Sequence, residues 1–209
     1  MHTTQHTIQQ VMTLSGVGMH TGCSVTLTCL PAPPDHGIKF QRVDVPDCPV
    51  IEAIADRVVD VTRSTTLGCN QVRIGTVEHV LAALSGLEID NVLIQLDGPE
   101  VPIMDGSALP FVEALQQAGL VEQGVLRRFF QVNEALIHRD EAQDVELAAF
   151  PLDDYRLAVM IGYDATVLQS QHASLARIGD FSQEIAPCRT FAFLHELEEI
   201  GRASCRERV

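Results

Sequence analysis

The 209-residue chain contains one lysine, Lys39, and has 28 acidic residues against 14 lysines and arginines, which gives a formal net charge of -14. No run of basic residues occurs in the body of the chain. Proteins whose main partner is a nucleic acid or an anionic membrane cluster positive charge on the binding face. We therefore expect neither partner. A small phosphate-bearing molecule is compatible with this charge, because a few single contacts such as Arg63 or Arg189 would suffice.

The sequence also lacks the patterns of membrane insertion, of export and of a cysteine framework. No stretch approaches the roughly 18 apolar residues of a membrane span, and the first ten residues lack the charged-then-apolar order of a secretory signal. We expect a cytoplasmic protein with no integral membrane segment. The cysteines show no C-x-x-C spacing, so they predict neither a zinc ribbon nor disulfides, and we interpret them as reduced packing residues. They are Cys23, Cys29, Cys48, Cys69, Cys188 and Cys205.

The hydrophobic content of 46% is enough for a substantial core, and the length fits one large domain or two small ones. Alternating apolar and polar residues predict strands, and apolar residues at three- and four-residue spacing predict helices. The expected strands cover residues 7–14, 23–30, 38–42 and 91–96, with a β-rich stretch of undefined register at 50–66. One helix is expected to begin after Thr76, and a second covers residues 108–118.

A linker is predicted from Gly119 to Gly124, after which the order of strands and helices begins again. The new strands are expected at residues 129–138, 144–149 and 155–161, and a helix over 185–199. We therefore expect an α+β fold of two-layer sandwiches, with a duplicated unit of strands followed by two helices whose second copy is incomplete. The expected domains are residues 1–124 and the truncated second domain 125–199.

The last ten residues, IGRASCRERV at 200–209, differ from the rest in their sudden density of arginine. Back-translated, this segment is similar to a common sequencing adapter. We expect it to be a non-native read-through tail at the end of a truncated gene.

Glu78 and His79 lie side by side at the start of the first expected helix, where Thr76 has the residue type of an N-cap. The helix N-terminus favours a negative charge and disfavours imidazolium, so Glu78 suits a base and His79 a metal ligand. The alternative interpretation is that Glu78 only complements the helix dipole and His79 is an ordinary histidine of a helix start.

Six separated strings resemble the LpxC family, the UDP-3-O-acyl-N-acetylglucosamine deacetylases of lipid A synthesis. The strings are SGVGMHTG at 15–22, RSTTLG at 63–68, TVEHVLAAL at 76–84, IDNVLI at 89–94, EVPIMDGSALPFVEAL at 100–115 and APCRTFAF at 186–193. Their order and spacing extend the resemblance to residue 199. The residues of these strings also resemble the form of the family that, in some bacteria, is fused to a hydroxyacyl-carrier-protein dehydratase.

The resemblance implies a zinc-dependent hydrolysis of the acetamide of UDP-3-O-(3-hydroxyacyl)-N-acetylglucosamine. It makes His79 a zinc ligand and Glu78 the general base that takes a proton from water. It makes Thr190 a donor to the tetrahedral oxyanion, Phe191 an aromatic against the sugar and Met19 an apolar residue near the acyl passage. Without the resemblance, Thr190 would be an N-cap, and Phe191 and Met19 would be core residues.

His20 and Asp105 also lie in matching strings and could support the metal site, although turn and N-cap roles suit them better. The family's other zinc ligands, a histidine and an aspartate, its oxyanion lysine and its general-acid histidine lie beyond the end of this chain. The segment HELEE at 195–199 lacks the second histidine of a metal motif, and His138 and His172 have no partner at ligand spacing. We therefore expect this chain to be inactive. The alternative function is a catalytically incomplete fragment that acts at most as a binding module.

Overall fold

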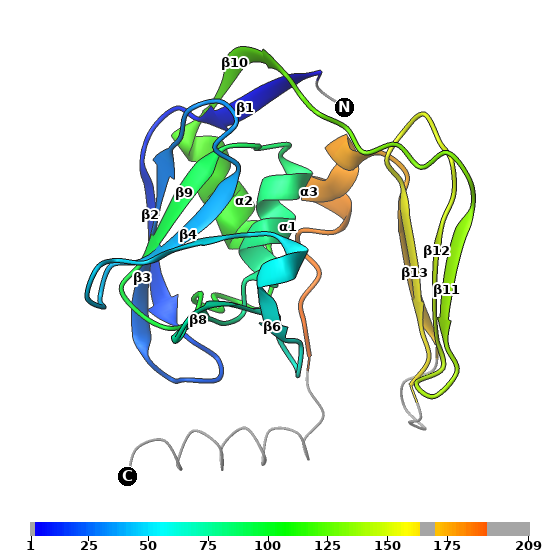
Figure 1. Ribbon diagram of the computed structural model, residues 1–209, viewed down its shortest axis with the longest axis horizontal. Helices are drawn as coiled ribbons and strands as arrows, with labels where there is room; N and C mark the ends of the chain where they lie inside the picture. Colours follow the sequence, from blue (N-terminus) through cyan, green and yellow to red (C-terminus); the bar gives the residue numbers. More distant parts are fainter. Residues whose placement is uncertain (1–2, 164–169, 192–209) are drawn as a thin grey trace.

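Five strands form the main sheet of the protein in the order β2-β3-β9-β4-β5. The computed structural model describes residues 3–163 and 170–191 (Figure 1). Neighbouring strands run antiparallel except β4 and β9, which are parallel. The strands are β2 (Met12–Val17), β3 (Ser24–Pro31), β9 (Val92–Leu96), β4 (Ile38–Arg42) and β5 (Val50–Glu52). The predictions at residues 23–30, 38–42 and 91–96 are confirmed to within a residue or two.

Two helices cover one face of this sheet, because each helix has one apolar side. They are α1 (Glu78–Gly86) and α2 (Leu109–Ala118). In α2 the fully buried side chains include Phe111 and Leu115, which pack into the same apolar cluster as Phe40 and Ile94 of the sheet. This confirms the second predicted helix. No helix in the described residues is long and apolar enough to cross a membrane.

A separate three-stranded sheet lies beside the start of α1. It consists of β6 (Val58–Asp60), β7 (Thr66–Cys69) and β8 (Val72–Ile74), and a 3-10 turn, η1 (Ala55–Arg57), precedes it. β5 and β6 lie in the β-rich stretch predicted at 50–66, β7 begins at its last residue, and β8 was not predicted. An isolated parallel bridge between Gly75 and Glu100 continues from this sheet toward α1.

The predicted strand at residues 7–14 is wrong, because two strands replace it. β1 (Thr4–Ile8) ends before β2 begins, and between them the N–H groups of Gln9 and Gln10 donate to the carbonyls of Gly119 and Ala118. Carbonyl groups at the end of α2 therefore accept the hydrogen bonds that a continuous strand would have donated to a neighbouring strand.

The predicted linker from Gly119 to Gly124 is also wrong. Residues Leu120–Leu126 form strand β10, which pairs antiparallel with β1, with Ile8 opposite Leu120. Gly119 ends α2 with a positive φ of 75°, so its conformational freedom serves a helix end that turns directly into a strand. The domain boundary expected at residue 124 falls inside β10.

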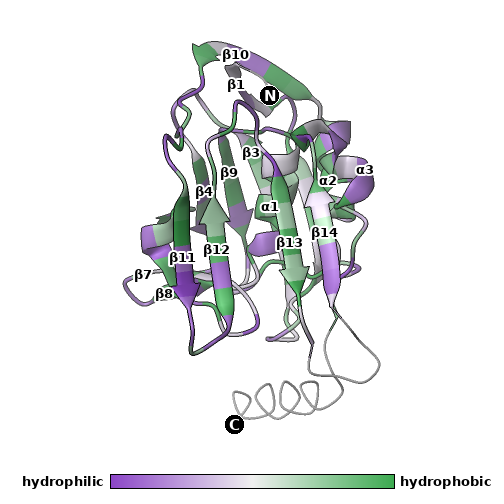
Figure 2. Ribbon diagram, turned by 90° about the vertical axis from the view of Figure 1, so that its right-hand side faces the viewer, coloured by the Kyte–Doolittle hydropathy of each residue, from purple (hydrophilic) through white to green (hydrophobic). Residues whose placement is uncertain are grey.

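Two β-hairpins follow β10 and lie on the other side of the helices from the main sheet (Figure 2). One pairs β11 (Leu136–Asp140) with β12 (Val145–Ala149), and the other pairs β13 (Leu157–Ile161) with β14 (Gln171–Leu175). Most of their apolar side chains are exposed, with Leu147 at 69% and Met160 at 80%, whereas Leu175 at the end of β14 is buried in the core. The predictions at residues 144–149 and 155–161 are confirmed to within two residues by β12 and β13. The prediction at 129–138 is wrong in its first part, because β11 begins only at Leu136, and β14 was not predicted. Whether these strands begin a duplicated unit stays a prediction.

The chain then returns to the first helix. A short turn, η2 (Ile178–Asp180), leads into α3 (Phe181–Glu184), and the ring of Phe181 packs so closely on Gly86 of α1 that a Cβ at Gly86 would overlap it. The helix predicted over residues 185–199 is wrong in its first part, because residues 185–191 are a turn and an extended segment. Residues 192–199 lie outside the described part of the chain.

Candidate active site

Glu78 and His79 are the first two residues of α1, as the sequence predicts, and both side chains are half-buried. Oε2 of Glu78 accepts a hydrogen bond from the backbone N–H of Thr65 at 2.9 Å. The N–H of Val77 donates to the carbonyl oxygen of Thr65 at 3.2 Å. These two bonds join the helix start to the string at 63–68 and hold the Glu78 carboxylate in place.

Thr76 is not an N-cap, which corrects the sequence prediction. The N-cap position belongs to Val77, and Thr76 has a positive φ of 58°. Its hydroxyl donates to Oε1 of Glu100 at 2.8 Å instead of capping the helix. A threonine in the left-handed region is uncommon and costs free energy, so contacts from outside the helix have to maintain it.

Glu100 is the buried acid of this region, with only 2% of its surface exposed. Its carboxylate accepts hydrogen bonds from the backbone N–H groups of His20 and Thr21 and from the hydroxyls of Thr21 and Thr76. Burial raises the pKa of Glu100, but these hydrogen bonds outweigh it and hold the pKa below its ordinary value. Glu100 is therefore ionised where the strings meet.

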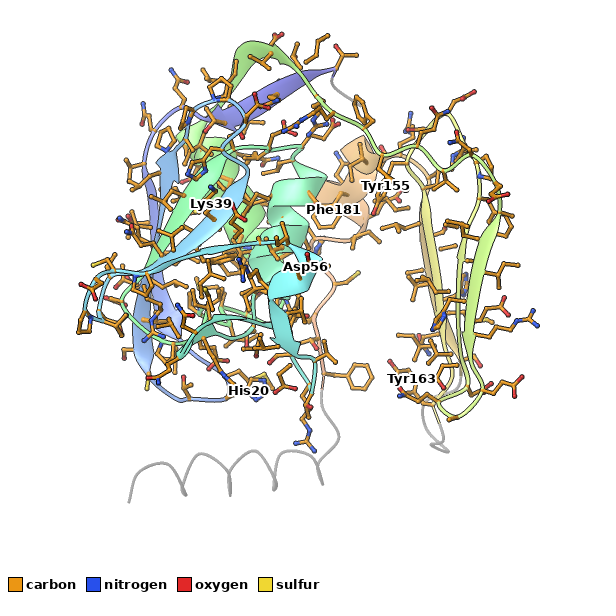
Figure 3. The ribbon with its side chains drawn as sticks, viewed as in Figure 1. His20, Lys39, Asp56, Tyr155, Tyr163 and Phe181 are labelled. Carbon is orange, nitrogen blue, oxygen red and sulfur yellow. The ribbon has the colours of Figure 1, made fainter. Side chains whose placement is uncertain are left out.

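The loop of SGVGMHTG is a closed turn that carries Met19 and His20, both half-buried. The N–H of Gly18 donates to the carbonyl of Cys23 at 2.9 Å, and the N–H of Gly22 to the carbonyl of Gly18 at 3.0 Å. The contact of His20 with Glu100 is made by its backbone N–H, which agrees with the predicted turn role. Figure 3 shows His20 at the lower end of the body of the protein.

Thr190 lies against the string that begins at Glu100. Its N–H donates to the carbonyl oxygen of Gly106 at 2.8 Å, and the guanidinium of Arg189 contacts Oδ2 of Asp105 at 3.3 Å. The hydroxyl of Ser107 donates to the other Asp105 oxygen at 2.7 Å. This bond and the Ser107 N–H, with a smaller effect of Arg189, hold the Asp105 pKa below its ordinary value. Asp105 therefore organises the turn before α2, as the sequence analysis favoured.

Phe191 is 53% exposed and contacts the ring of Tyr163 edge to face, with the ring centroids 5.4 Å apart. Tyr163 follows β13, and Figure 3 shows it at the lower end of the hairpins. The contact joins the second hairpin to the segment that carries Thr190. No motif or periodic pattern in the sequence singles out Tyr163.

The structure brings five of the six strings together in one network. In addition to the contacts above, the N–H of Ile103 donates to the carbonyl of Val17 at 3.0 Å. The sixth string, IDNVLI, forms β9, and its Asn91 bonds to Gln5, Gln123 and the N–H of Gly37. This sixth string therefore builds the fold, whereas the other five surround the start of α1 and the Asp105 turn. The role of Thr190 as a donor to the oxyanion stays a prediction.

The described residues do not supply a complete metal site. No group of three or more histidine, cysteine, aspartate or glutamate side chains in residues 3–163 and 170–191 could hold a metal ion. Zinc needs at least three protein ligands, and His79 provides one candidate. His138 and His172 are exposed on β11 and β14, which confirms that they are surface strand histidines. The HELEE segment lies outside the described residues.

Sequence reasoning missed Glu100 and Thr65. Thr65 acts through its backbone, so no residue type identifies it. Glu100 follows the Gly98-Pro99 pair after a predicted strand and begins one of the matching strings.

Comparison with known proteins matches residues 5–207 to the family described as UDP-3-O-acyl N-acetylglycosamine deacetylase, LpxC. The "Bifunctional enzyme LpxC/FabZ" of Chlorobaculum tepidum is 46% identical over 198 residues, which are 94% of this chain and 42% of that protein. The bifunctional enzyme of Bacteroides thetaiotaomicron is 41% identical over 196 residues, 94% of this chain and 42% of its own length. The "UDP-3-O-acyl-N-acetylglucosamine deacetylase" of Myxococcus xanthus is 44% identical over 198 residues, 94% of this chain and 62% of that protein.

The chain thus spans less than half the length of these two bifunctional relatives and under two thirds of the deacetylase. The family match includes residues 200–207, so it does not separate the expected read-through tail from the rest. The match covers nearly the whole chain, and the contacts described above join the strings that suggested the family. The chain belongs to the LpxC family of UDP-3-O-acyl N-acetylglycosamine deacetylases.

Proposed function

We propose that this chain is the front part of an enzyme that hydrolyses the acetamide of UDP-3-O-(3-hydroxyacyl)-N-acetylglucosamine. The products are the free amine and acetate, in the committed step of lipid A synthesis. The observation that carries the proposal is the network of five family strings around Glu78 and His79 at the start of α1. The membership of the family supports the same reaction.

Glu78 is the proposed general base. Its carboxylate is half-buried at a helix N-terminus, and the Thr65 N–H holds Oε2 at 2.9 Å. A base must be held in one position to take a proton from an attacking water, and such a group contributes about 10²–10⁴-fold to the rate. The contact with Thr65 restrains the side chain while the helix end favours its negative charge.

The proposed cofactor is Zn²⁺, with His79 as one ligand. A bound zinc ion would polarise the amide carbonyl and make water a better nucleophile at neutral pH. The described residues do not complete such a site, and the family resemblance implies that the other ligands lie beyond the end of this chain. We therefore propose that the 209-residue chain by itself has negligible deacetylase activity.

Three further residues have proposed roles with the substrate. Thr190 donates to the oxyanion, and its backbone bond to Gly106 supports a fixed position for that donor. Phe191 contacts the sugar with an exposed ring that is oriented by Tyr163. Met19 lies near the acyl chain on the loop that Glu100 holds. Each role rests on the matching string in which the residue lies.

We further propose that the intact protein has a dehydratase part after the deacetylase, because two relatives are named as LpxC/FabZ bifunctional enzymes. A cytoplasmic location is proposed with it. The alternative function, a binding module without catalysis, is not favoured by a family match over residues 5–207.

The test is acetate release from UDP-3-O-(3-hydroxymyristoyl)-N-acetylglucosamine by the purified intact protein, with the amine product identified by mass spectrometry. The proposal predicts turnover that a chelator removes and added Zn²⁺ restores, while the 209-residue chain releases no acetate. An intact protein that binds zinc but leaves the substrate unchanged would contradict the proposed reaction.

A further inference from the structure

Glu100 connects two segments that the sequence keeps far apart. On one side it binds the loop of residues 17–22, through the N–H groups of His20 and Thr21 at 2.9–3.1 Å and the Thr21 hydroxyl at 2.8 Å. On the other side it binds the Thr76 hydroxyl at 2.8 Å. Thr76 stands two residues before Glu78 and three before His79.

The bond to Thr76 bears on the direction in which α1 begins. The φ of Thr76 is 58°, a conformation that a β-branched residue avoids, and it turns the chain sharply into the helix. The backbone of Gly75 is fixed on the same side, since its N–H donates to the carbonyl of Pro99 and its carbonyl accepts from Val101. The Glu100 segment thus holds both the backbone and the side chain of the turn that aims Glu78 and His79.

The bonds to the loop are equally close. A Cβ on Gly18 would overlap the Glu100 carboxylate and the Thr21 hydroxyl, so this glycine is required by the close approach of the loop to the acid. The loop folds around the Glu100 carboxylate, which accepts hydrogen bonds from the N–H groups of His20 and Thr21 and from the Thr21 hydroxyl. A glutamine in its place has the same shape, but its NH₂ group would face an N–H or O–H donor.

We propose that Glu100 is a positioning residue for the deacetylation, which holds the helix start of Glu78 and His79 and the Met19 loop in one fixed arrangement. This inference rests on the proposed function. Glu100 touches neither substrate nor metal in this account. Its hydrogen bond with Thr76 fixes the position of Glu78 and His79. Its hydrogen bonds with His20 and Thr21 fix the loop beside the acyl chain.

The two sides can be separated by experiment in the intact protein. Thr76→Val removes the hydroxyl on the helix side and should lower kcat about tenfold with KM nearly unchanged. Thr21→Val removes the hydroxyl on the loop side and should raise KM severalfold with a smaller effect on kcat. Glu100→Gln should lower kcat about tenfold to a hundredfold and raise KM as well. A role in stability alone would lower the melting temperature without this division between kcat and KM.

The matched control is Glu88→Gln, which removes another partly buried carboxylate, paired with Arg127 at 2.7 Å at the opposite end of α1. It should change stability while kcat and KM stay at the wild-type values. Equal losses of kcat in Glu88→Gln and Glu100→Gln would overturn the positioning role, and so would wild-type kcat and KM in all three site variants.

Amide hydrogen exchange of the 209-residue chain gives a readout that is independent of activity. Glu100→Gln should speed exchange at least tenfold in peptides covering residues 17–22 and 75–80, with β10 unchanged. Unchanged exchange in those two segments would overturn the proposal. An inactive wild-type intact protein with the expected exchange pattern would instead contradict the proposed function, so the two failures are distinguishable.

Discussion

The backbone N–H of Thr65 donates to Oε2 of Glu78 at 2.9 Å, so the first side chain of α1 is held by a segment that lies before the helix. A carboxylate at a helix start would otherwise turn back to cap its own helix. In this structure Glu78 is held from outside, by a residue of another matching string. Hydrogen bonds from outside the helix therefore fix the segment that carries the proposed base, Glu78, and the proposed metal ligand, His79.

His79→Ala should reduce zinc binding by the intact protein, because a catalytic zinc site has few protein ligands and the loss of one weakens it strongly. Metal content after dialysis should fall from about one zinc per protein to a small fraction. The control is His172→Ala, an exposed histidine on β14. Full zinc occupancy in the His79 variant would contradict the assignment of this residue as a ligand.

Arg127→Met should lower the free energy of unfolding of the 209-residue chain by about 3 kcal/mol. The Arg127 side chain is 13% exposed and pairs with Glu88 and Asp90, both at 2.7 Å, so its loss leaves two partly buried carboxylates without this partner. Urea unfolding measures the change. The neighbouring Arg128 is the matched control, because it is 87% exposed and its pair with Asp35 is longer, at 3.4 Å. A similar loss in Arg128→Met would contradict the prediction.

Glu100 should make the stability of the chain depend on pH in the acid range. Its folded pKa lies below the ordinary 4.5, so the unfolded chain binds the proton more readily. The contribution is therefore complete above pH 4.5 and is lost as the pH falls through the folded pKa. Urea unfolding of wild type and Glu100→Gln across this range should show a shallower acid loss in the variant. Parallel curves for the two proteins would be inconsistent with an ionised Glu100.

Limited proteolysis of the 209-residue chain should cut the hairpins before the main sheet. The hairpin strands expose apolar side chains such as Leu147 and Met160, whereas β1 and β10 pair along the body. Regions with little burial open at low cost in free energy. We expect a resistant fragment that ends near Arg127, slightly beyond the boundary drawn from the sequence. Equal resistance of all segments up to residue 191 would contradict this expectation.

Periodicity in the sequence was sufficient for the elements whose burial follows a regular pattern. The strand Ile38–Arg42, the helix Leu109–Ala118 and the start of α1 at Glu78 lie where the sequence predicts them. In these segments each residue faces either the core or solvent, so the spacing of apolar residues carries the information. Family strings then identified the residues of the candidate site.

Long-range contacts explain the failures. Thr76 has the residue type of an N-cap, but Glu100 takes its hydroxyl and the backbone adopts a positive φ. Gly119 indicated a linker, but the strand after it pairs with β1, more than 100 residues earlier in the chain. The burial of Glu100 depends on amides of the 17–22 loop, which no local pattern relates to it. These contacts join residues that are far apart in the sequence, so local sequence patterns do not predict them.

Acetate release by the intact protein with Glu78→Gln tests the proposed role of Glu78 as the general base. The glutamine keeps an oxygen that can accept from Thr65 but cannot take a proton from water, so the fold and zinc content should persist. We expect a kcat at least about 10²-fold below wild type, while Glu113→Gln, which changes an exposed glutamate on α2, keeps the wild-type rate. A Glu78→Gln protein that releases acetate at the wild-type rate would contradict the account.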